Sequence, residues 1–364
     1  MGTKHIESGI GKRLEPAIPD NKLFDKPMNS NTVVFSGPRV VELREEVLPP
    51  LADNEFLLRA EHSLISTGTE TIVLQGEFEP DSHWDNWVKY PFYPGYCMVG
   101  TVEQVGAGCT QFAVGDRVAT RTGHRSLAVV PDAPLVRAVK VPEGVSPSDA
   151  AWFGMATIAQ NGVRRARHEL GDNVVIIGAG LLGQFVTQYL RIFGAREIIV
   201  IDVSPKRLDL AAKHGASHTL QMGAKEATEA VFDLTRGRGA DVVYDVTGHP
   251  AVFAPALGLA KRFGTLLLLG DTAHPGEQRL TPDVMTRGVQ IIAAHDGHPP
   301  LESSERDYWS SARMAELFFH FLQSGQMRVS DLVTHTYQPH QAPEAYEMLL
   351  RDRSAALGVL FDWR

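Results

Sequence analysis

Three glycines in the string GAGLLG stand at the spacing G-x-G-x-x-G, with Gly178, Gly180 and Gly183 at the fixed positions. The string follows the apolar run VVII and opens an amphipathic segment, so it is predicted to lie where a buried strand turns into a helix. Gly178 permits the tight turn, Gly180 lets the backbone approach a pyrophosphate, and Gly183 lets helix and strand pack closely. The helix begins at Leu181 and Leu182, where free N–H groups face the anion. This context predicts a dinucleotide-binding site.

Asp202 ends the next predicted strand, about 20 residues beyond the glycine loop. Its carboxylate can accept both ribose hydroxyls of an adenosine there and would repel a 2′-phosphate, which favours NAD(H) over NADP(H). Lys206 and Arg207 follow closely and weaken this preference, because their cations attract a phosphate. The alternative interpretation is a glycine turn and a surface aspartate with no ligand.

The elements that must position these residues fall into two groups. From residue 32 to about residue 142, short β-rich strings such as TVVFSG and MVGTVEQVG are broken by Gly, Pro, Asn and Asp, which predicts a barrel-like antiparallel domain. A helical segment, SPSDAAWFGMATIAQNGVRRAR, follows. From residue 172 apolar strands and amphipathic helices alternate, which predicts a doubly wound parallel sheet of the Rossmann type. The expected fold class is therefore α/β.

Composition and charge argue against several classes of function. The 364 residues carry a net charge of −8 with no Lys/Arg-rich run, which argues against a nucleic-acid or anionic-membrane partner. No apolar run approaches the roughly 18 residues of a membrane helix, and the N-terminal stretch has no signal-peptide core. The two cysteines, Cys97 and Cys109, are too few for a disulfide framework. We therefore expect a cytoplasmic protein with a small-molecule substrate.

Several strings together resemble the medium-chain dehydrogenase/reductase family: PGYCMVGTVEQVG, FAVGDRV, GAGLLG, VIDVSPKRLDLAAKHGA and DVVYDVTG. The resemblance extends from about residue 32 to the end of the chain. It implies a GroES-like β-barrel catalytic domain beside the Rossmann domain, a cofactor cleft between them, and hydride transfer to or from a carbonyl, alcohol or activated alkene. It also implies that Thr157 and Thr247 lie by the nicotinamide cofactor and that the string VQIIAAH pairs across a homodimer.

The domain boundaries follow from the same resemblance. We expect an N-terminal arm at 1–30, the first part of the catalytic domain at 31–157, the Rossmann domain at 158–300, and a return to the catalytic domain at 301–364.

Many members of this family hold a catalytic zinc, so the ligand positions can be compared. Thr67 stands where the first cysteine would be, Tyr96 and Cys97 replace a histidine and a glutamate, and Phe153 stands near the third ligand. A catalytic zinc needs about three converging N, S or O ligands, and these positions offer one thiol. The four-cysteine lobe of a structural zinc is also missing. We therefore predict no metal and interpret Cys97 as a small buried residue. Among zinc-independent branches, the strings ISTGTE and PGY most resemble the group of the bacteriochlorophyllide hydroxyethyl dehydrogenase.

Without zinc, other groups must move a proton and stabilise a developing oxyanion. We predict Tyr96 as the acid/base or oxyanion donor, assisted by Thr67, with Glu70 behind it and Ser66 in the substrate pocket. Each role has a structural alternative. Tyr96 can be a packed aromatic with a satisfied hydroxyl, Glu70 can pair with an arginine, and Thr67 can stabilise its own turn.

Two further groups are candidates for the substrate pocket. His295 and His298, in the string AAHDGHPP, can shuttle protons near neutral pH or can be solvated loop residues. Trp84 and Trp87 precede the Pro-Gly turn. They can form the wall of a pocket for a large or planar apolar substrate, or they can pack their own segment onto the barrel.

The sequence as a whole predicts a zinc-independent, NAD(H)-linked oxidoreductase that interconverts a secondary alcohol and a ketone. One alternative is an NADPH-dependent reductase of an α,β-unsaturated carbonyl, of the quinone or enoyl reductase type. That alternative predicts a basic residue where Asp202 stands. The other is a catalytically silent dinucleotide-binding protein, which an apolar cleft with no donor near the nicotinamide would favour.

Overall fold

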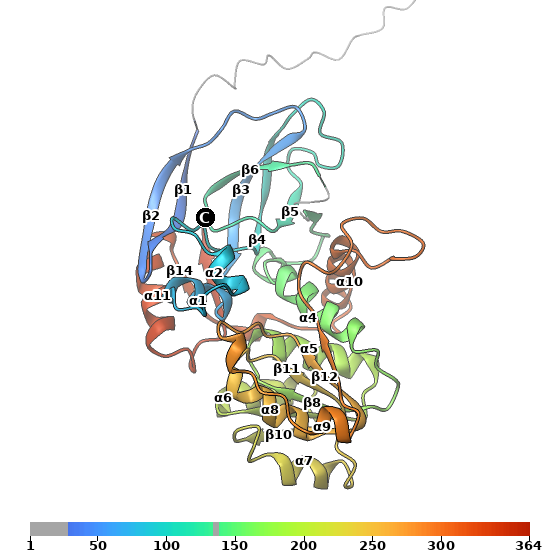
Figure 1. Cartoon of the computed structure of the whole chain (residues 1–364). Helices are drawn as coiled ribbons and strands as arrows, with labels where there is room; N and C mark the ends of the chain where they lie inside the picture. The colour runs from blue at the N-terminus through green and yellow to red at the C-terminus, as the bar shows by residue number, and fades with distance from the viewer. Residues whose placement is uncertain (1–27, 134–137) are drawn as a thin grey trace, which may run out of the picture.

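The structure, a computed structural model, describes residues 28–133 and 138–364. The N-terminal arm predicted at 1–30 lies outside these residues, apart from residues 28–30. Figure 1 shows the described chain as two lobes, with a β-rich lobe above and a helix-covered parallel sheet below. Within the described ranges, no helix combines the length and the apolar character needed to cross a membrane.

The β-rich lobe is built on a seven-stranded sheet in the order β14-β15-β3-β4-β5-β7, with β6 paired to β3. β15 pairs antiparallel with β3, with Phe361 opposite Ser63, so a C-terminal strand completes this sheet. A separate antiparallel hairpin consists of β1 and β2. The strands of the lobe are β1 (Asn29–Gly37), β2 (Val40–Val47), β3 (Glu55–Leu64), β4 (Met98–Val105), β5 (Arg117–Thr120), β6 (Leu127–Pro131), β7 (Val139–Lys140), β14 (Val333–Tyr337) and β15 (Gly358–Asp362).

Short helices of this lobe carry several of the candidate residues. α1 follows the turn ISTG directly and ends at Gly76, which has a left-handed φ of 70°. α2 begins at the N-cap Ser82, whose hydroxyl accepts a hydrogen bond from the amide of Asp85. The helical elements are α1 (Thr69–Gln75), α2 (His83–Trp87), α3 (Pro147–Ala150), η4 (Ser330–Leu332), η5 (Pro339–Gln341) and α11 (Ala342–Arg351).

The second lobe holds six parallel strands in the order β10-β9-β8-β11-β12-β13, which confirms the predicted doubly wound sheet. β9 and β11 lie on opposite sides of β8, so the strand order reverses there. Ligands of such sheets bind beyond the carboxyl ends of the strands at this reversal. The elements are β8 (Asn173–Ile177), α5 (Leu181–Phe193), β9 (Glu197–Asp202), α6 (Pro205–His214), β10 (His218–Gln221), α7 (Thr228–Leu234), β11 (Ala240–Asp245), α8 (Pro250–Leu259), β12 (Ala260–Leu268), η3 (Pro275–Glu277), α9 (Asp283–Thr286) and β13 (Gln290–Ala293).

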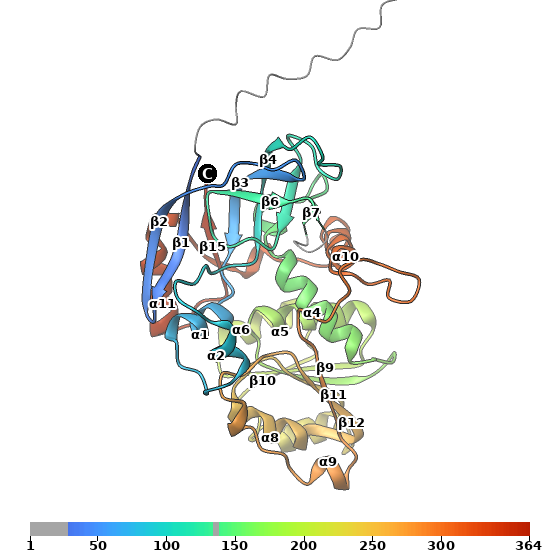
Figure 2. The same cartoon turned by 45° about the horizontal axis from the view of Figure 1, so that its top comes forward.

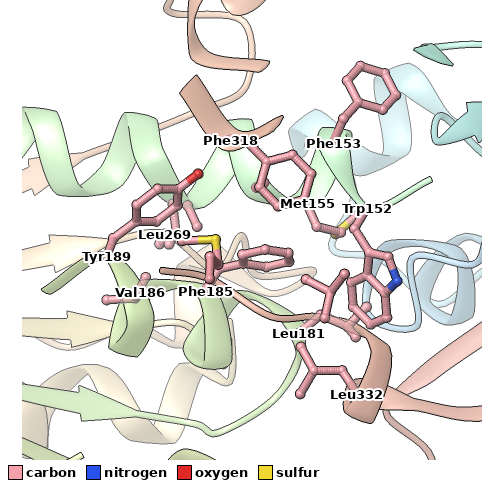
Figure 3. Close-up of a cluster of buried hydrophobic side chains, with 14 of the residues drawn as sticks. Trp152, Phe153, Met155, Leu181, Phe185, Val186, Tyr189, Leu269, Phe318 and Leu332 are labelled. Carbon is pink, nitrogen blue, oxygen red and sulfur yellow. The ribbon is translucent and has the colours of Figure 1, made fainter. Parts of the chain in front are cut away.

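Helix α4 (Phe153–Arg165) joins the two lobes and packs against α5 and α10 (Ser311–Gln323). Figure 2 shows α4 between the barrel strands and the parallel sheet. The ring centres of Trp152 and Phe185 lie 5.9 Å apart, and Phe185 meets Phe318 at 5.8 Å. Figure 3 shows these side chains within one apolar cluster. Because burial of each such side chain stabilises by about 1.5–3 kcal/mol, this shared core fixes the lobes against each other.

Candidate active site

The glycine loop has the geometry that a dinucleotide requires. Gly178 follows β8 with a φ of 101°, a backbone conformation that residues other than glycine rarely adopt. A Cβ on Gly183 would overlap the carbonyl oxygen of Gly178, so strand and helix approach too closely for any other residue. Around Gly180 nothing lies within 4 Å of a built Cβ, which leaves the backbone open to a pyrophosphate. Leu181 and Leu182 form the first turn of α5, as predicted.

Asp202 lies beside this loop at the end of β9. Its carboxylate accepts hydrogen bonds from the amides of Ala179 at 2.7 Å and Ser204 at 2.8 Å, which fixes its orientation against the loop. Each carboxylate oxygen retains accepting capacity, so Asp202 can still receive a ribose hydroxyl. Thr247, two residues beyond β11, lies against the loop, because its methyl group would be 3.0 Å from a Cβ placed on Gly178.

The two cations predicted near the adenosine lie in different places. Lys206 is exposed at the start of α6. Arg207 is partly buried, and its guanidinium donates to the carbonyl oxygens of Arg353 and Ala356 in the segment before β15. The structure therefore gives Arg207 a contact with the return segment that the sequence prediction did not include, while the charges of Arg207 and Asp202 still act on each other.

Tyr96 is half-buried at the start of β4, and its hydroxyl has two side-chain partners. The oxygen of Ser66 lies 2.6 Å away and that of Thr69 lies 3.4 Å away. Burial raises the pKa of Tyr96 above its usual 10.0, although the two hydroxyls and the charge of Arg121 act in the opposite direction. Thr67 was predicted to assist Tyr96, but the carbonyl oxygen of Thr67 instead accepts a hydrogen bond from the hydroxyl of Thr71 in α1. Its neighbours Ser66 and Thr69 supply the contacts that were expected of Thr67.

Glu70 is fully buried and is bound from three directions. Its Oε1 accepts the amide N–H of Ser66 at 2.7 Å, and its Oε2 accepts the hydroxyl of Tyr346 and lies 3.1 Å from Nε2 of His124. The predicted structural alternative, an arginine partner, is therefore wrong about the residue type. Glu70 reaches Tyr96 only through Ser66, so it positions the hydroxyl pair and joins α1 to α11.

Arg121, just beyond β5, is the residue of this site that the sequence analysis missed. Its side chain is 9% exposed. Nη2 donates to Oγ1 of Thr157 at 2.9 Å, to the carbonyl oxygen of Gly154 at 3.2 Å and to Oδ1 of Asp296 at 2.7 Å. The guanidinium carbon lies 5.4 Å from the ring centre of Tyr96. Arg121 in the string VATRTGHR gives no local signal of these contacts, although it follows β5, which pairs with the strand that begins just after PGYC.

Cys97 lies next to this arginine and has the packing role that the sequence predicted. It is 1% exposed within the main apolar cluster, and burial raises the pKa of its thiol to about 12. A thiol with this pKa is neutral near pH 7, so Cys97 does not supply a thiolate there.

Position 154 has room only for a glycine, because the thiol of Cys97 lies against it. A Cβ at this position would overlap the Cys97 sulfur and lie 3.2 Å from Nη1 of Arg121. We expect Gly154→Ala to lower the free energy of unfolding by about 1–3 kcal/mol, because thiol and guanidinium must both shift. Gly258→Ala is the matched control in a thermal or chemical unfolding measurement, since a Cβ on this helical glycine meets nothing within 4 Å. Equal stability of the two variants would contradict the close packing described here.

Comparison with known proteins identifies both lobes. Residues 53–136 match the alcohol dehydrogenase GroES-like domain, and residues 182–307 match the domain described as zinc-binding dehydrogenase. The chain carries both domains of the medium-chain dehydrogenase/reductase family.

Individual relatives cover nearly the whole chain. Sorbitol dehydrogenase from Bacillus subtilis is 26% identical over 92% of this chain and 97% of its own length. D-guloside 3-dehydrogenase from Escherichia coli is 26% identical over 90% and 99%. The fold also matches the crystal structure of an Escherichia coli oxidoreductase/dehydrogenase of unknown specificity, with a TM-score of 0.78, 20% identity, and coverage of 92% and 99%. The named relatives are dehydrogenases, which confirms the prediction of an NAD(P)-dependent oxidoreductase.

The family description raises the question of whether these residues fit a zinc ion. Among the residues that the structure describes, no group of three or more His, Cys, Asp or Glu side chains could hold a metal. Tyr96, Cys97 and Phe153, which stand at or near ligand positions of the family, surround the guanidinium of Arg121, and the Cys97 thiol has a raised pKa. A buried cation repels a second one. This donor set does not fit zinc.

The predicted pocket residues divide into two groups. Trp84 is 4% exposed and packs on Phe78 in the apolar cluster around α2 and α11, so it does not line an open pocket. Trp87 is 46% exposed, and its ring stacks on that of His83. His83 in turn meets the edge of the His295 ring at 5.8 Å, which brings α2 against the loop after β13. His298 lies 5.8 Å beyond His295, and these three exposed or partly exposed rings line the boundary of the lobes.

Proposed function

We propose that the chain is a zinc-independent, NAD(H)-linked oxidoreductase that interconverts a secondary alcohol and a ketone. The observation that carries this proposal is the replacement of the family's ligand set by Tyr96, Cys97 and a buried guanidinium. The names of the relatives, sorbitol dehydrogenase and D-guloside 3-dehydrogenase, support a CH–OH substrate.

The chain's own residues supply the proton chemistry. When bound, the nicotinamide supplies or accepts the hydride. A phenol whose pKa is raised by burial stays protonated at neutral pH, so Tyr96 is suited to donate its proton to the alkoxide that forms from a ketone. Ser66, 2.6 Å from the Tyr96 oxygen, can donate a hydrogen bond to the tyrosinate that remains, which then takes up one proton from solvent, and Glu70 holds the backbone of Ser66 in place.

Asp202 supports NAD(H) as the cofactor. Its carboxylate is held beside the glycine loop by two amides, where a 2′-phosphate would meet a fixed negative charge. Arg207 already donates to the carbonyl oxygen of Ala356 in the return segment, so part of its hydrogen-bonding capacity is not open to a 2′-phosphate.

Further expectations complete the proposal. The strings ISTGTE and PGY support a place near the bacteriochlorophyllide hydroxyethyl dehydrogenase group. The exposed ring of Trp87 supports a large or planar apolar substrate. β13 is an edge strand with Ile291 exposed, which supports edge pairing in a homodimer. We also expect the protein to act in the cytoplasm, with no nucleic-acid or membrane partner.

A substrate panel tests the proposed reaction. We expect the protein to reduce ketones with NADH, to oxidise the matching secondary alcohols with NAD, and to bind NADH more tightly than NADPH. The panel should contain aliphatic and aryl ketones, their alcohols, and cyclic enones, each followed by nicotinamide absorbance. Preferred reduction of the enone C=C bond with NADPH would contradict the proposal and favour the enoyl reductase alternative.

A further inference from the structure

We propose that Arg121 binds the substrate oxygen that gains negative charge during hydride transfer, at the place where other members of the family use zinc. This inference rests on the zinc-independent function proposed above. It assigns a substrate-binding and charge-stabilising role to a residue of the β-rich lobe.

The hydrogen bonds of Arg121 leave part of its guanidinium without an acceptor. The three polar contacts of the guanidinium are all made by Nη2. Nε and Nη1 are buried and have no partner among the described residues. A guanidinium stays charged at any ordinary pH. Leaving a buried N–H group without an acceptor costs about 1–3 kcal/mol, and more for a charged group. A substrate oxygen within reach of these N–H groups would offset that cost.

The location of the guanidinium favours the reacting oxygen as its ligand. Arg121 lies over the rings of Tyr96 at 5.4 Å and Phe153 at 5.6 Å. Its Nη2 is bound to Gly154 and Thr157 on the first turns of α4. Two of the three segments that supply the ligand positions of the family therefore hold this cation between them.

The charge of Arg121 acts on the neighbouring groups in the direction that an oxyanion requires. It lowers the pKa of the Tyr96 hydroxyl and of the Cys97 thiol, against the larger effect of burial on both. An alkoxide in the same place would be stabilised by the same field, because charge interactions are strong where water is excluded.

Asp296 orients the guanidinium from the other lobe. Its Oδ1 accepts a hydrogen bond from Nη2 at 2.7 Å, which joins the loop after β13 to the segment just beyond β5. Since Nη2 is occupied by this carboxylate and by α4, the ligand is received by Nε and Nη1. We therefore regard Asp296 as a positioning residue.

In the proposed reaction Arg121 donates hydrogen bonds and transfers no proton. In ketone reduction the hydride from the reduced nicotinamide forms a C–H bond at the carbonyl carbon, and the π electron pair of the C=O bond moves to oxygen. That oxygen then takes the proton of Tyr96, and the nicotinamide is left oxidised. Arg121 remains protonated and holds the oxygen by N–H groups throughout.

The test compares Arg121→Ala with the parent protein in steady-state reduction of the ketone that the parent reduces fastest. We expect kcat to fall about 10²- to 10³-fold, the usual cost of losing one oxyanion donor. NADH binding, followed by fluorescence titration, should be unchanged. Guanidinium chloride at low millimolar concentration should restore part of kcat, which a merely structural role would not predict.

Arg125→Ala is the matched control, because Arg125 lies in the same segment and is partly buried over the ring of Tyr93, outside the site. It should keep the kcat of the parent. If Arg121→Ala does not fold, Arg121→Lys takes its place; a lysine keeps the charge but has one ammonium group in place of the planar guanidinium. Its kcat should fall with an unchanged circular dichroism spectrum.

Two results would overturn the inference. One is an unchanged kcat with a raised KM, which would mean that Arg121 binds a remote group of the substrate such as a carboxylate. The other is an unchanged kcat and KM in zinc-free protein. Zinc is measured in the same preparations, because one zinc per chain would overturn the proposed function whatever Arg121 does, whereas an unaffected zinc-free variant overturns only the role of Arg121.

Discussion

Tyr96→Phe is expected to lower kcat for ketone reduction by about 10²- to 10⁴-fold, the range that a positioned general acid contributes. The phenylalanine ring keeps the packing under Arg121 but removes the hydroxyl that lies 2.6 Å from Ser66. The alkoxide then has no direct proton donor among the residues that form this site. Cofactor binding should be unaffected, because the glycine loop lies in the other lobe.

The measurement is steady-state kinetics combined with NADH titration. Tyr93→Phe is the matched control, since this exposed tyrosine contacts Glu46 on the surface of the barrel. The raised pKa of Tyr96 also gives a pH profile. Because the protonated phenol is the active form, kcat of reduction should stay level through neutral pH and fall only above the usual tyrosine value of 10.0. An unchanged kcat in Tyr96→Phe would remove Tyr96 from the mechanism.

Glu70→Ala is expected to lower the free energy of unfolding by about 3–5 kcal/mol, the cost of breaking a buried polar network by removing one partner. The variant leaves the amide of Ser66, the ring of His124 and the hydroxyl of Tyr346 without their shared acceptor. The loss should appear as a lower denaturant midpoint in chemical unfolding.

Two further variants show whether this loss comes from the network. Glu70→Gln should lose less stability, because its amide oxygen can still accept the Ser66 N–H. Glu77→Ala removes an exposed acid paired with Arg39 at 3.0 Å and should change stability by less than about 1 kcal/mol. If Glu70→Ala were as stable as Glu77→Ala, the three contacts would not contribute to the fold.

The parts of the site that follow local rules could be predicted from the sequence. Gly178, Gly180 and Gly183 act within six residues of each other, and the strand before them and the helix after them are visible as apolar and amphipathic runs. Asp202 follows from the same unit, because the end of the second strand lies beside the loop in every such sheet.

The parts that depend on long-range contacts could not be predicted. Tyr346 reaches Glu70 across 276 positions of sequence, and Asp296 reaches Arg121 across 175. No periodicity connects residues so far apart. Trp84 shows the limit of residue type as a guide, because its apolar ring fits a pocket wall and a packed cluster equally well and only the fold places it in the cluster.

The most direct test of the proposed mechanism is the metal content of active protein. The purified chain, after dialysis against a chelator, should contain no stoichiometric zinc by inductively coupled plasma mass spectrometry and should reduce its ketone substrate with NADH at the undialysed rate. This result is expected because the described residues give a cation in place of converging ligands. One zinc per chain, with activity lost on its removal and restored on its return, would contradict the account.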